Sequence, residues 1–219
     1  MEQSSGYRPI GHPLRPGDPQ QAFDFYLNQP RRPVRPERLY LGLFWGADDA
    51  ARIGDVGAGF VCDHHLPGKL IEPARLHLSL HHLGDYKRLR GKVIYAAQLA
   101  GSAVSLPSFD LTFRFIKTFD AAPSRHGEAR WRPLVLLTEA EALSILHATL
   151  GDALQRNGLR SARHFTPHVT LFYGPQQVPL QEIAPISVPV RDFTLIHSRR
   201  GLGEYRLLGR WPLRNQDAV

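Results

Sequence analysis

The sequence contains two short motifs, HLSL and HVTL, in which a histidine is followed two positions later by a hydroxyl residue. Side chains in a β-strand alternate between two faces, so His77 and Ser79 share one face while the leucines of their motif point to the other. The same alternation puts His168 and Thr170 on one face. Two such strands facing across a cleft would bring two imidazoles and two hydroxyls together.

This set of side chains suits the opening or closing of a phosphodiester at the 2′,3′ edge of a ribose without a metal ion. An unperturbed imidazole has a pKa of about 6.5, so a neutral base and a protonated acid can coexist near neutral pH. One histidine would deprotonate an attacking water and the other would protonate the departing ribose oxygen, while the hydroxyls donate to the non-bridging oxygens. We therefore predict that His77, Ser79, His168 and Thr170 are catalytic.

Residues next to the motifs are candidates for substrate contact. By strand alternation Arg75 and His81 share the face of the first histidine, and Phe172 shares the face of the second, where it could stack a nucleobase. We predict a substrate-binding role for these three residues. The competing interpretations are solvated strand ends for Arg75 and His81 and core packing for Phe172.

Cysteine and histidine residues cluster in the first half of the chain, which raises the question of zinc. Their spacing matches no standard pairing of zinc ligands, so we expect neither a metal site nor a cofactor. The residues concerned are Cys62, His64, His65, His81 and His82. His82 and a further histidine, His147, lie on apolar faces and are expected in the core or at its boundary.

The motifs belong to a strand, helix, strand pattern that occurs twice, at 38–84 and 131–174, so the chain looks duplicated. In each copy the second strand carries the motif. A weaker helix and a strand with period-two alternation separate the copies, and two final strands form a hairpin whose turn contains Arg199 and Arg200. The expected helices are 48–62, with Asp48 as its N-cap, 87–100 and 139–157. The last of these has an apolar stripe of Leu143, Leu146, Leu150 and Leu154 and ends at Asn157 and Gly158. The expected strand between the two copies is 108–119.

The paired tetrads, each after a strand and a helix, resemble those of the 2H phosphoesterase superfamily, and most closely its 2′-5′ RNA ligase-like and 2′,3′-cyclic phosphodiesterase branch. The resemblance spans about 38 to 213. It implies an α+β, bilobal, duplicated fold with two antiparallel β-sheets flanking a central cleft and helices on the outside. It also implies a metal-free cleft for 2′,3′-cyclic phosphates or 2′-5′ linkages, with His77 and His168 as catalytic histidines and Ser79 and Thr170 as phosphate-binding hydroxyls.

Two positions depart from that family's pattern. Five residues after the first motif histidine, where an aromatic residue is common, this chain has His82. Five residues after the second, where several ligase-like members have arginine, it has Tyr173. The second departure bears on RNA-end chemistry in particular.

Composition favours a folded chain with a polyanionic partner. Of 219 residues 42% are hydrophobic, enough for a sizeable core, which excludes the disordered class. The 27 Lys and Arg exceed the 20 Asp and Glu, and 23 of the cations are Arg, whose planar fork grips phosphate. Nucleic acid is the first candidate partner, although genomic base composition explains the arginine excess equally well.

The single cysteine excludes an internal disulfide, and no apolar window approaches the ~18 residues that a membrane span needs. We expect a cytoplasmic protein that binds RNA or a nucleotide with a cyclic phosphate and no membrane. The oligomeric state is unknown, a monomer being favoured.

The first 37 residues form a separate N-terminal arm. They hold seven of the 18 prolines, a density that prevents long helices and central strands. A short helix is expected at 18–28, and the sequence does not reveal the arm's function. Residues 38–219 are expected to form a single bilobal domain.

The function predicted from the sequence is a phosphodiesterase that hydrolyses 2′,3′-cyclic phosphate or 2′-5′ linked ribonucleotides. One alternative is an RNA-binding module with an inactive cleft. Another is a 2′-5′ RNA ligase, which would use the same residues in reverse.

Overall fold

The computed structural model describes residues 35–120, 131–162, 164–200, 202 and 204–214. The helix expected at 18–28 lies outside the described residues. In chain order the elements are β1 (Glu37–Phe44), α2 (Ala47–Asp63), β2 (Lys69–Leu70), the 3-10 helix η1 (Pro73–Arg75), β3 (His77–Tyr86), α3 (Gly91–Ser102), β4 (Phe109–Thr118), β5 (Arg132–Leu137), α4 (Glu141–Arg156), β6 (His168–Gly174), β7 (Gln181–Val190), β8 (Asp192–Arg199) and β9 (Glu204–Pro212).

The strands form one antiparallel nine-stranded sheet in the order β7-β4-β5-β6-β3-β1-β8-β9, with β2 beside β6. The α+β class is therefore confirmed, but the expectation of two separate sheets is wrong. The two halves join because β3 and β6, the motif strands, pair with each other at Leu78 and Val169. Strand patterning could not show this, since the sequence of a strand does not specify which neighbour it pairs with.

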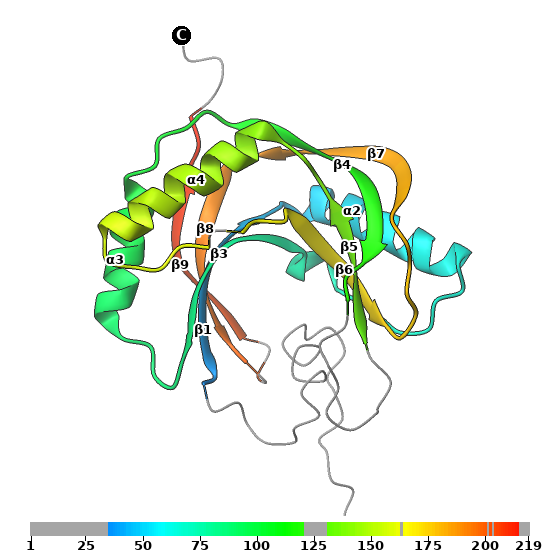
Figure 1. Ribbon diagram of the computed structural model, residues 1–219, viewed down its shortest axis with the longest axis horizontal. Coiled ribbons are helices and arrows are strands. Elements are labelled where there is room, and N and C mark those ends of the chain that lie inside the picture. Colours follow the sequence, from blue (N-terminus) through cyan, green and yellow to red (C-terminus); the bar gives the residue numbers. More distant parts are fainter. Residues whose placement is uncertain (1–34, 121–130, 163, 201, 203, 215–219) are drawn as a thin grey trace, which may run out of the picture.

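The sheet curls so that its two halves face one another, with α3 and α4 lying together against one half (Figure 1). Helix α3 packs on β8 and β9, and α4 packs on β3. Helix α2 packs on β6, which belongs to the second half of the chain. The helix of each strand, helix, strand unit thus packs on the motif strand of the other unit.

The helices form where the apolar spacing predicts them. Along α4 the expected leucine stripe is fully buried, and the helix ends at Asn157, before a glycine with a left-handed φ of 73°. For α2 the expected cap is wrong: the N-cap is Gly46, and Asp48 lies in the first turn, where its charge favours the positive end of the helix.

The strands expected from the sequence are present except near the C-terminus, and β2 and most of β7 have no counterpart among them. The first of the two final strands, expected over 188–198, divides at Arg191 into the end of β7 and most of β8. Strand β7 pairs with β4 at one edge of the sheet, whereas β8 pairs with β1 near the other. None of the helices in the described part of the chain combines the length and the hydropathy needed to cross a membrane.

A stack of three rings joins α4 to the sheet. The ring of His147 lies 4.0 Å from that of His81 and 4.1 Å from that of Phe165, parallel to both within 17°. His147 is buried, as its apolar surroundings predict. Burial, reinforced by the nearby His81, lowers the pKa of His147 to about 4.

This stack predicts sensitivity to acid. The unfolded chain binds a proton on His147 near pH ~6.5, whereas the folded protein resists it until the pH reaches about 4. The free energy of unfolding should therefore fall as the pH drops through that window. In His147→Phe the stacked ring remains but cannot bind a proton. Denaturant titrations at a series of pH values give the free energy of unfolding as a function of pH, and in the variant the slope of that plot should correspond to about one proton fewer than in the wild type. An unchanged slope would contradict the assignment.

Candidate active site

The pairing of β3 with β6 brings the two motifs together. Leu78 and Val169 are the paired residues, and both are fully buried on one side of the sheet. Antiparallel geometry then places His77 across from Thr170, and Ser79 across from His168, on the opposite face. Each imidazole therefore lies beside the hydroxyl of the other motif.

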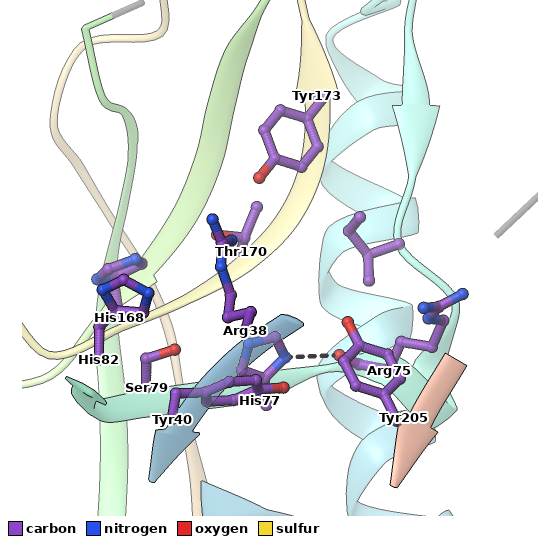
Figure 2. A pocket seen from close by; sticks show the side chains of 11 residues that line it. Arg38, Tyr40, Arg75, His77, Ser79, His82, His168, Thr170, Tyr173 and Tyr205 are labelled. Atoms are coloured by element: carbon purple, nitrogen blue, oxygen red, sulfur yellow. Dashed lines mark hydrogen bonds between the residues drawn. The ribbon is translucent and has the colours of Figure 1, made fainter. Parts of the chain in front are cut away.

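A cavity of about 300 Å³ opens on this face. The volume is at the lower end of the range for small-molecule sites. Figure 2 shows the four predicted catalytic side chains gathered around it. The lining residues are Arg38, Tyr40, Ile71, Arg75, His77, Ser79, His82, His168, Thr170, Tyr173 and Tyr205.

Both motif histidines are oriented in the same way by their own backbone. Nδ1 of His77 lies 2.9 Å from the carbonyl oxygen of Arg75, and Nδ1 of His168 lies 2.7 Å from that of Thr166. A carbonyl oxygen only accepts hydrogen bonds, so Nδ1 carries the proton in each neutral ring. Nε2 of each ring is then the atom left for proton transfer in the pocket.

Aromatic side chains hold the two imidazoles. The ring of Phe44 stacks on His77 at 5.2 Å, and Tyr40 packs against the same imidazole at 5.4 Å. Phe119 meets His168 edge-on at 4.9 Å. These contacts restrict the orientations of the two imidazole rings.

The surroundings of both histidines favour the neutral ring. Burial lowers the pKa of His77, and the positive charges of His168, Arg75 and Arg38 lower it further, against the hydrogen bond to the Arg75 carbonyl. Burial also lowers the pKa of His168, against its hydrogen bond to Thr166. His77 has cationic neighbours that His168 lacks, so the two imidazoles differ electrostatically despite their matching motifs.

The structure does not bring His81 into the pocket. In the pairing of β1 with β3, Gly42 lies opposite Ser79 but the preceding residue, Leu41, lies opposite His81, so Leu80 is an extra residue in a β-bulge. The bulge reverses the alternation, so His81 points into the core and His82 lines the pocket. The expectation that His82 is a core or boundary residue is therefore also wrong.

Phe172 is displaced by a matching bulge on β6. Leu134 lies opposite Phe172 and Val135 opposite Thr170, which makes Leu171 the extra residue. Phe172 is consequently buried in the core, the alternative that its sequence left open, and Tyr173 lines the pocket instead. Each bulge follows directly after the motif hydroxyl.

His81 has a structural environment. Its Nε2 lies 2.9 Å from the carbonyl oxygen of His147, and its Nδ1 accepts a hydrogen bond of 3.2 Å from the backbone N–H of Ala162. Its neutral ring therefore carries the proton on Nε2, opposite to the motif histidines.

Arg75 lines the pocket as predicted, although it lies in the short helix η1 and not in a strand. Its guanidinium lies 4.7 Å from the centre of the Tyr205 ring. The hydroxyls of Tyr205 and Tyr40 interact electrostatically at the pocket wall, and burial together with Tyr205 raises the pKa of Tyr40. The Tyr173 hydroxyl is hydrogen bonded to Thr170.

Several lining residues are not among those expected from the sequence. Arg38 and Tyr40 had a usable signal, because they alternate along a strand expected next to the first motif strand. His82 and Tyr173 had one too, since they occupy matching positions after the two motifs. Ile71 and Tyr205 had none, because only tertiary contacts place them.

One carboxylate links two of these unexpected residues. Asp85 accepts hydrogen bonds from Arg38 at 2.8 and 3.0 Å and from His82 at 3.0 Å. Arg200 Nη1 lies 3.4 Å from the same carboxylate, and its side chain is only 11% exposed. Arg200, which the sequence places in the turn of the final hairpin, is therefore not a solvated turn residue.

The structure does not gather the residues considered for zinc. Cys62, His64 and His65 lie at and beyond the C-terminal end of α2, whereas His81 is buried in the ring stack and His82 lines the pocket. Among the described residues no group of His, Cys, Asp or Glu side chains is arranged to hold a metal ion.

Known proteins resemble this chain in sequence and in fold. The family described as the 2′-5′ RNA ligase superfamily matches residues 50–202. A search of curated proteins finds no match.

Among solved structures, that of apo E. coli LigT is similar, with a TM-score of 0.58 and 27% sequence identity, covering 82% of this chain and 99% of that one. LigT complexed with 3′-AMP gives a TM-score of 0.57 at 27% identity, covering 82% and 98%. A Thermus thermophilus protein, TT0787, shares the fold, with a TM-score of 0.61 at 21% identity, covering 82% and 99%.

The tautomers of the histidines can be checked directly. ¹⁵N NMR of the imidazoles should show His77 and His168 as Nδ1–H tautomers in their neutral form, because both donate Nδ1–H to a carbonyl oxygen. His81 is the internal control and should be the Nε2–H tautomer. The titrations of His77 and His168 should have midpoints below about 6.5. An Nε2–H tautomer at either motif histidine would contradict the geometry.

Proposed function

The chain belongs to the 2′-5′ RNA ligase superfamily, and we propose that it is a metal-independent phosphodiesterase that hydrolyses the 2′,3′-cyclic phosphate, or a 2′-5′ linkage, of ribonucleotides. The observation that carries the proposal is the crossed arrangement of two imidazoles and two hydroxyls at one pocket. Nucleotide substrates are further supported by the LigT structures, which include complexes with 3′-AMP and ATP.

The reaction needs one neutral and one protonated imidazole. The neutral ring takes a proton from water at Nε2, and the hydroxide oxygen forms a bond to phosphorus. The bond from phosphorus to one ribose oxygen breaks, and the protonated ring delivers its Nε2 proton to that oxygen. The product is a phosphomonoester with a free neighbouring ribose hydroxyl, and the two histidines have exchanged protonation states.

We assign the base to His77 and the acid to His168. His77 lies between two aromatic rings, and its cationic neighbours Arg38 and Arg75 disfavour a further positive charge on it. The pKa of His168 is lowered by burial, against its hydrogen bond to Thr166, and not by these two arginines. The bound phosphate, being negative, would stabilise the imidazolium of His168 when the substrate is present.

The hydroxyls serve the non-bridging oxygens. Charge grows on these oxygens as water attacks, and donors fixed in advance stabilise it without reorganisation. Ser79 has room to reach the substrate because its strand partner is Gly42, which has no side chain. Thr170 is oriented by its hydrogen bond with Tyr173.

Alanine substitutions test the two-histidine chemistry. His77→Ala and His168→Ala should each lower kcat for a 2′,3′-cyclic nucleotide by ~10²-fold or more, because each removes one proton transfer. Turnover is measured in excess chelator, with ³¹P NMR identifying which ester bond breaks. The exposed His64, at the end of α2, provides a control, and His64→Ala should retain wild-type kcat.

Circular dichroism must show that the two histidine variants remain folded. Near-wild-type turnover in either one would defeat the mechanism. Loss of turnover on chelation alone would show that a metal takes part.

A binding function without turnover is the competing proposal, favoured by the basic composition of the chain. Salt-sensitive binding of RNA by a wild-type protein that hydrolyses no cyclic phosphate would support it. The ligase direction uses the same groups, and formation of a 2′-5′ linkage from cyclic phosphate and 5′-hydroxyl ends would reveal it.

The lowered pKa values of His77 and His168 predict that kcat/KM is highest at acidic pH. Both imidazoles have lowered pKa values in the free protein, so kcat/KM should follow a bell whose maximum lies below pH ~6.5. The bound phosphate raises both pKa values, so the kcat profile should lie at higher pH than the kcat/KM profile. The two limbs of each bell-shaped profile report apparent pKa values that belong to the coupled pair of histidines and not to either residue alone. A kcat/KM maximum above pH ~8 would be inconsistent with this environment.

A further inference from the structure

The carbonyl groups that orient the two motif histidines are held in different ways. The Arg75 carbonyl, which orients His77, belongs to η1, and this short helix has its own hydrogen bonds from Arg75 N–H to Glu72 at 2.9 Å and from Leu76 N–H to Pro73 at 3.0 Å. The Thr166 carbonyl orients His168. It lies in the segment 157–167 between α4 and β6, which has neither helix nor strand among its described residues.

The imidazole of His81 ties this segment to the core at Ala162. The backbone N–H of Ala162 donates to Nδ1 of His81 at 3.2 Å, and Nε2–H of His81 donates to the carbonyl oxygen of His147 at 2.9 Å. The side chain of His81 is only 1% exposed, and both of its ring nitrogens are used. One buried ring thus joins the motif strand β3, helix α4 and the segment that leads into β6.

Phe165 makes a second tie, three residues before His168. Its ring lies 4.1 Å from the ring of His147 and parallel to it within 6°, and His147 in turn stacks on His81 at 4.0 Å. Helix α4 approaches the stack closely at Gly151, where a Cβ atom would lie 3.2 Å from Cε1 of His81. The stack is therefore enclosed between α4 and β3, and it holds Phe165 in place.

The chain between Phe165 and His168 is stiff. Thr166 precedes a proline, which restricts its backbone to extended conformations, and the ring of Pro167 fixes its own φ. The position of Phe165 is therefore passed on to the Thr166 carbonyl, which accepts the Nδ1–H of His168 at 2.7 Å. The orientation of the His168 imidazole thus depends on where the stack holds Phe165.

We propose that His81, His147 and Phe165 are positioning residues for His168, and that their stack holds the Thr166 carbonyl so that the Nε2 proton of His168 is directed into the pocket. The inference rests on the proposed function for the acid role of His168 and deepens it. The β-bulge that removes His81 from the pocket places it in this stack. His77 does not depend on the stack, because η1 holds its carbonyl partner.

A displaced acid affects the chemical step more than binding. His168 delivers its proton to the departing ribose oxygen, and a small misplacement of a reacting group lowers the rate strongly. The substrate is also held by groups that the stack does not contact, among them Ser79 of β3. Loss of the stack should therefore lower kcat and leave KM nearly unchanged.

Phe165→Ala is the first variant, because Phe165 is only partly buried and the substitution removes the tie next to Thr166. ¹⁵N NMR should show neutral His168 as a mixture of its two tautomers, while neutral His77 remains Nδ1–H. The kcat for adenosine 2′,3′-cyclic phosphate should fall by ~10-fold or more, with KM within ~2-fold of the wild-type value.

His81→Gln tests the other tie. The glutamine amide keeps a donor for the His147 carbonyl but leaves Ala162 without the Nδ1 acceptor, so the His168 tautomer should change in the same direction. His147→Phe is the conservative variant. It keeps three stacked rings and the backbone carbonyl that accepts from His81, so His168 should remain Nδ1–H.

Val188→Ala controls for loss of stability alone. Val188 is a buried residue of β7 outside the stack and the pocket. Its truncation should lower the free energy of unfolding, measured by denaturant titration, without changing kcat or the His168 tautomer. The same tautomer change in Val188→Ala as in Phe165→Ala would overturn the proposal, because general destabilisation would then explain both.

An unchanged His168 tautomer in folded Phe165→Ala overturns the proposal, and so does an equal change at His77 and His168. If Phe165→Ala does not fold, His81→Gln decides by the same criteria. The tautomer is measured without substrate, which separates the two levels of inference. Wild-type turnover with an unchanged tautomer in the variant leaves the proposed function standing. A changed tautomer in a protein whose wild type hydrolyses no cyclic phosphate supports the positioning role and contradicts the phosphodiesterase.

Discussion

The pairing of Leu78 with Val169 is the contact on which the rest of this structure depends. Two strands far apart in the sequence meet there, and the paired residues are apolar and fully buried. Because the strands run antiparallel, the polar residue on each side of Leu78 lies across from one on the other strand. A single hydrophobic pairing thus joins two half-sheets and assembles two imidazole–hydroxyl combinations.

Two β-bulges then decide what surrounds those groups. Regular alternation would carry His81 and Phe172 into the pocket, but an extra residue after each motif hydroxyl sends both into the core. The residue that follows each of them faces the pocket instead. A bulge leaves one residue of the strand without a regular partner. Here it allows two consecutive side chains of each strand to be buried, and the residue that follows them, His82 or Tyr173, lines the pocket.

The pocket combines neutral imidazoles with fixed positive charge. Each motif histidine donates Nδ1–H to a carbonyl oxygen two residues earlier, so its tautomer is set by its own segment of chain. Arg38 comes from β1 and Arg75 from η1, directly before His77, and their charges give the two imidazoles unequal surroundings. The local motif supplies symmetric acid–base groups, and the tertiary structure makes them different.

The sequence by itself determined the helices, most of the strands and the four motif residues, because helical and strand periodicities and a local two-residue spacing are properties of short segments. The leucine stripe of α4 and the shared face of His77 and Ser79 are examples. Only the tertiary structure decided that the sheet is continuous, that His82 and Tyr173 line the site, and that Arg38 and Tyr205 reach it. Strand partners, bulges and long-range contacts depend on which distant segment packs against which, and that choice is made by the burial of the whole core.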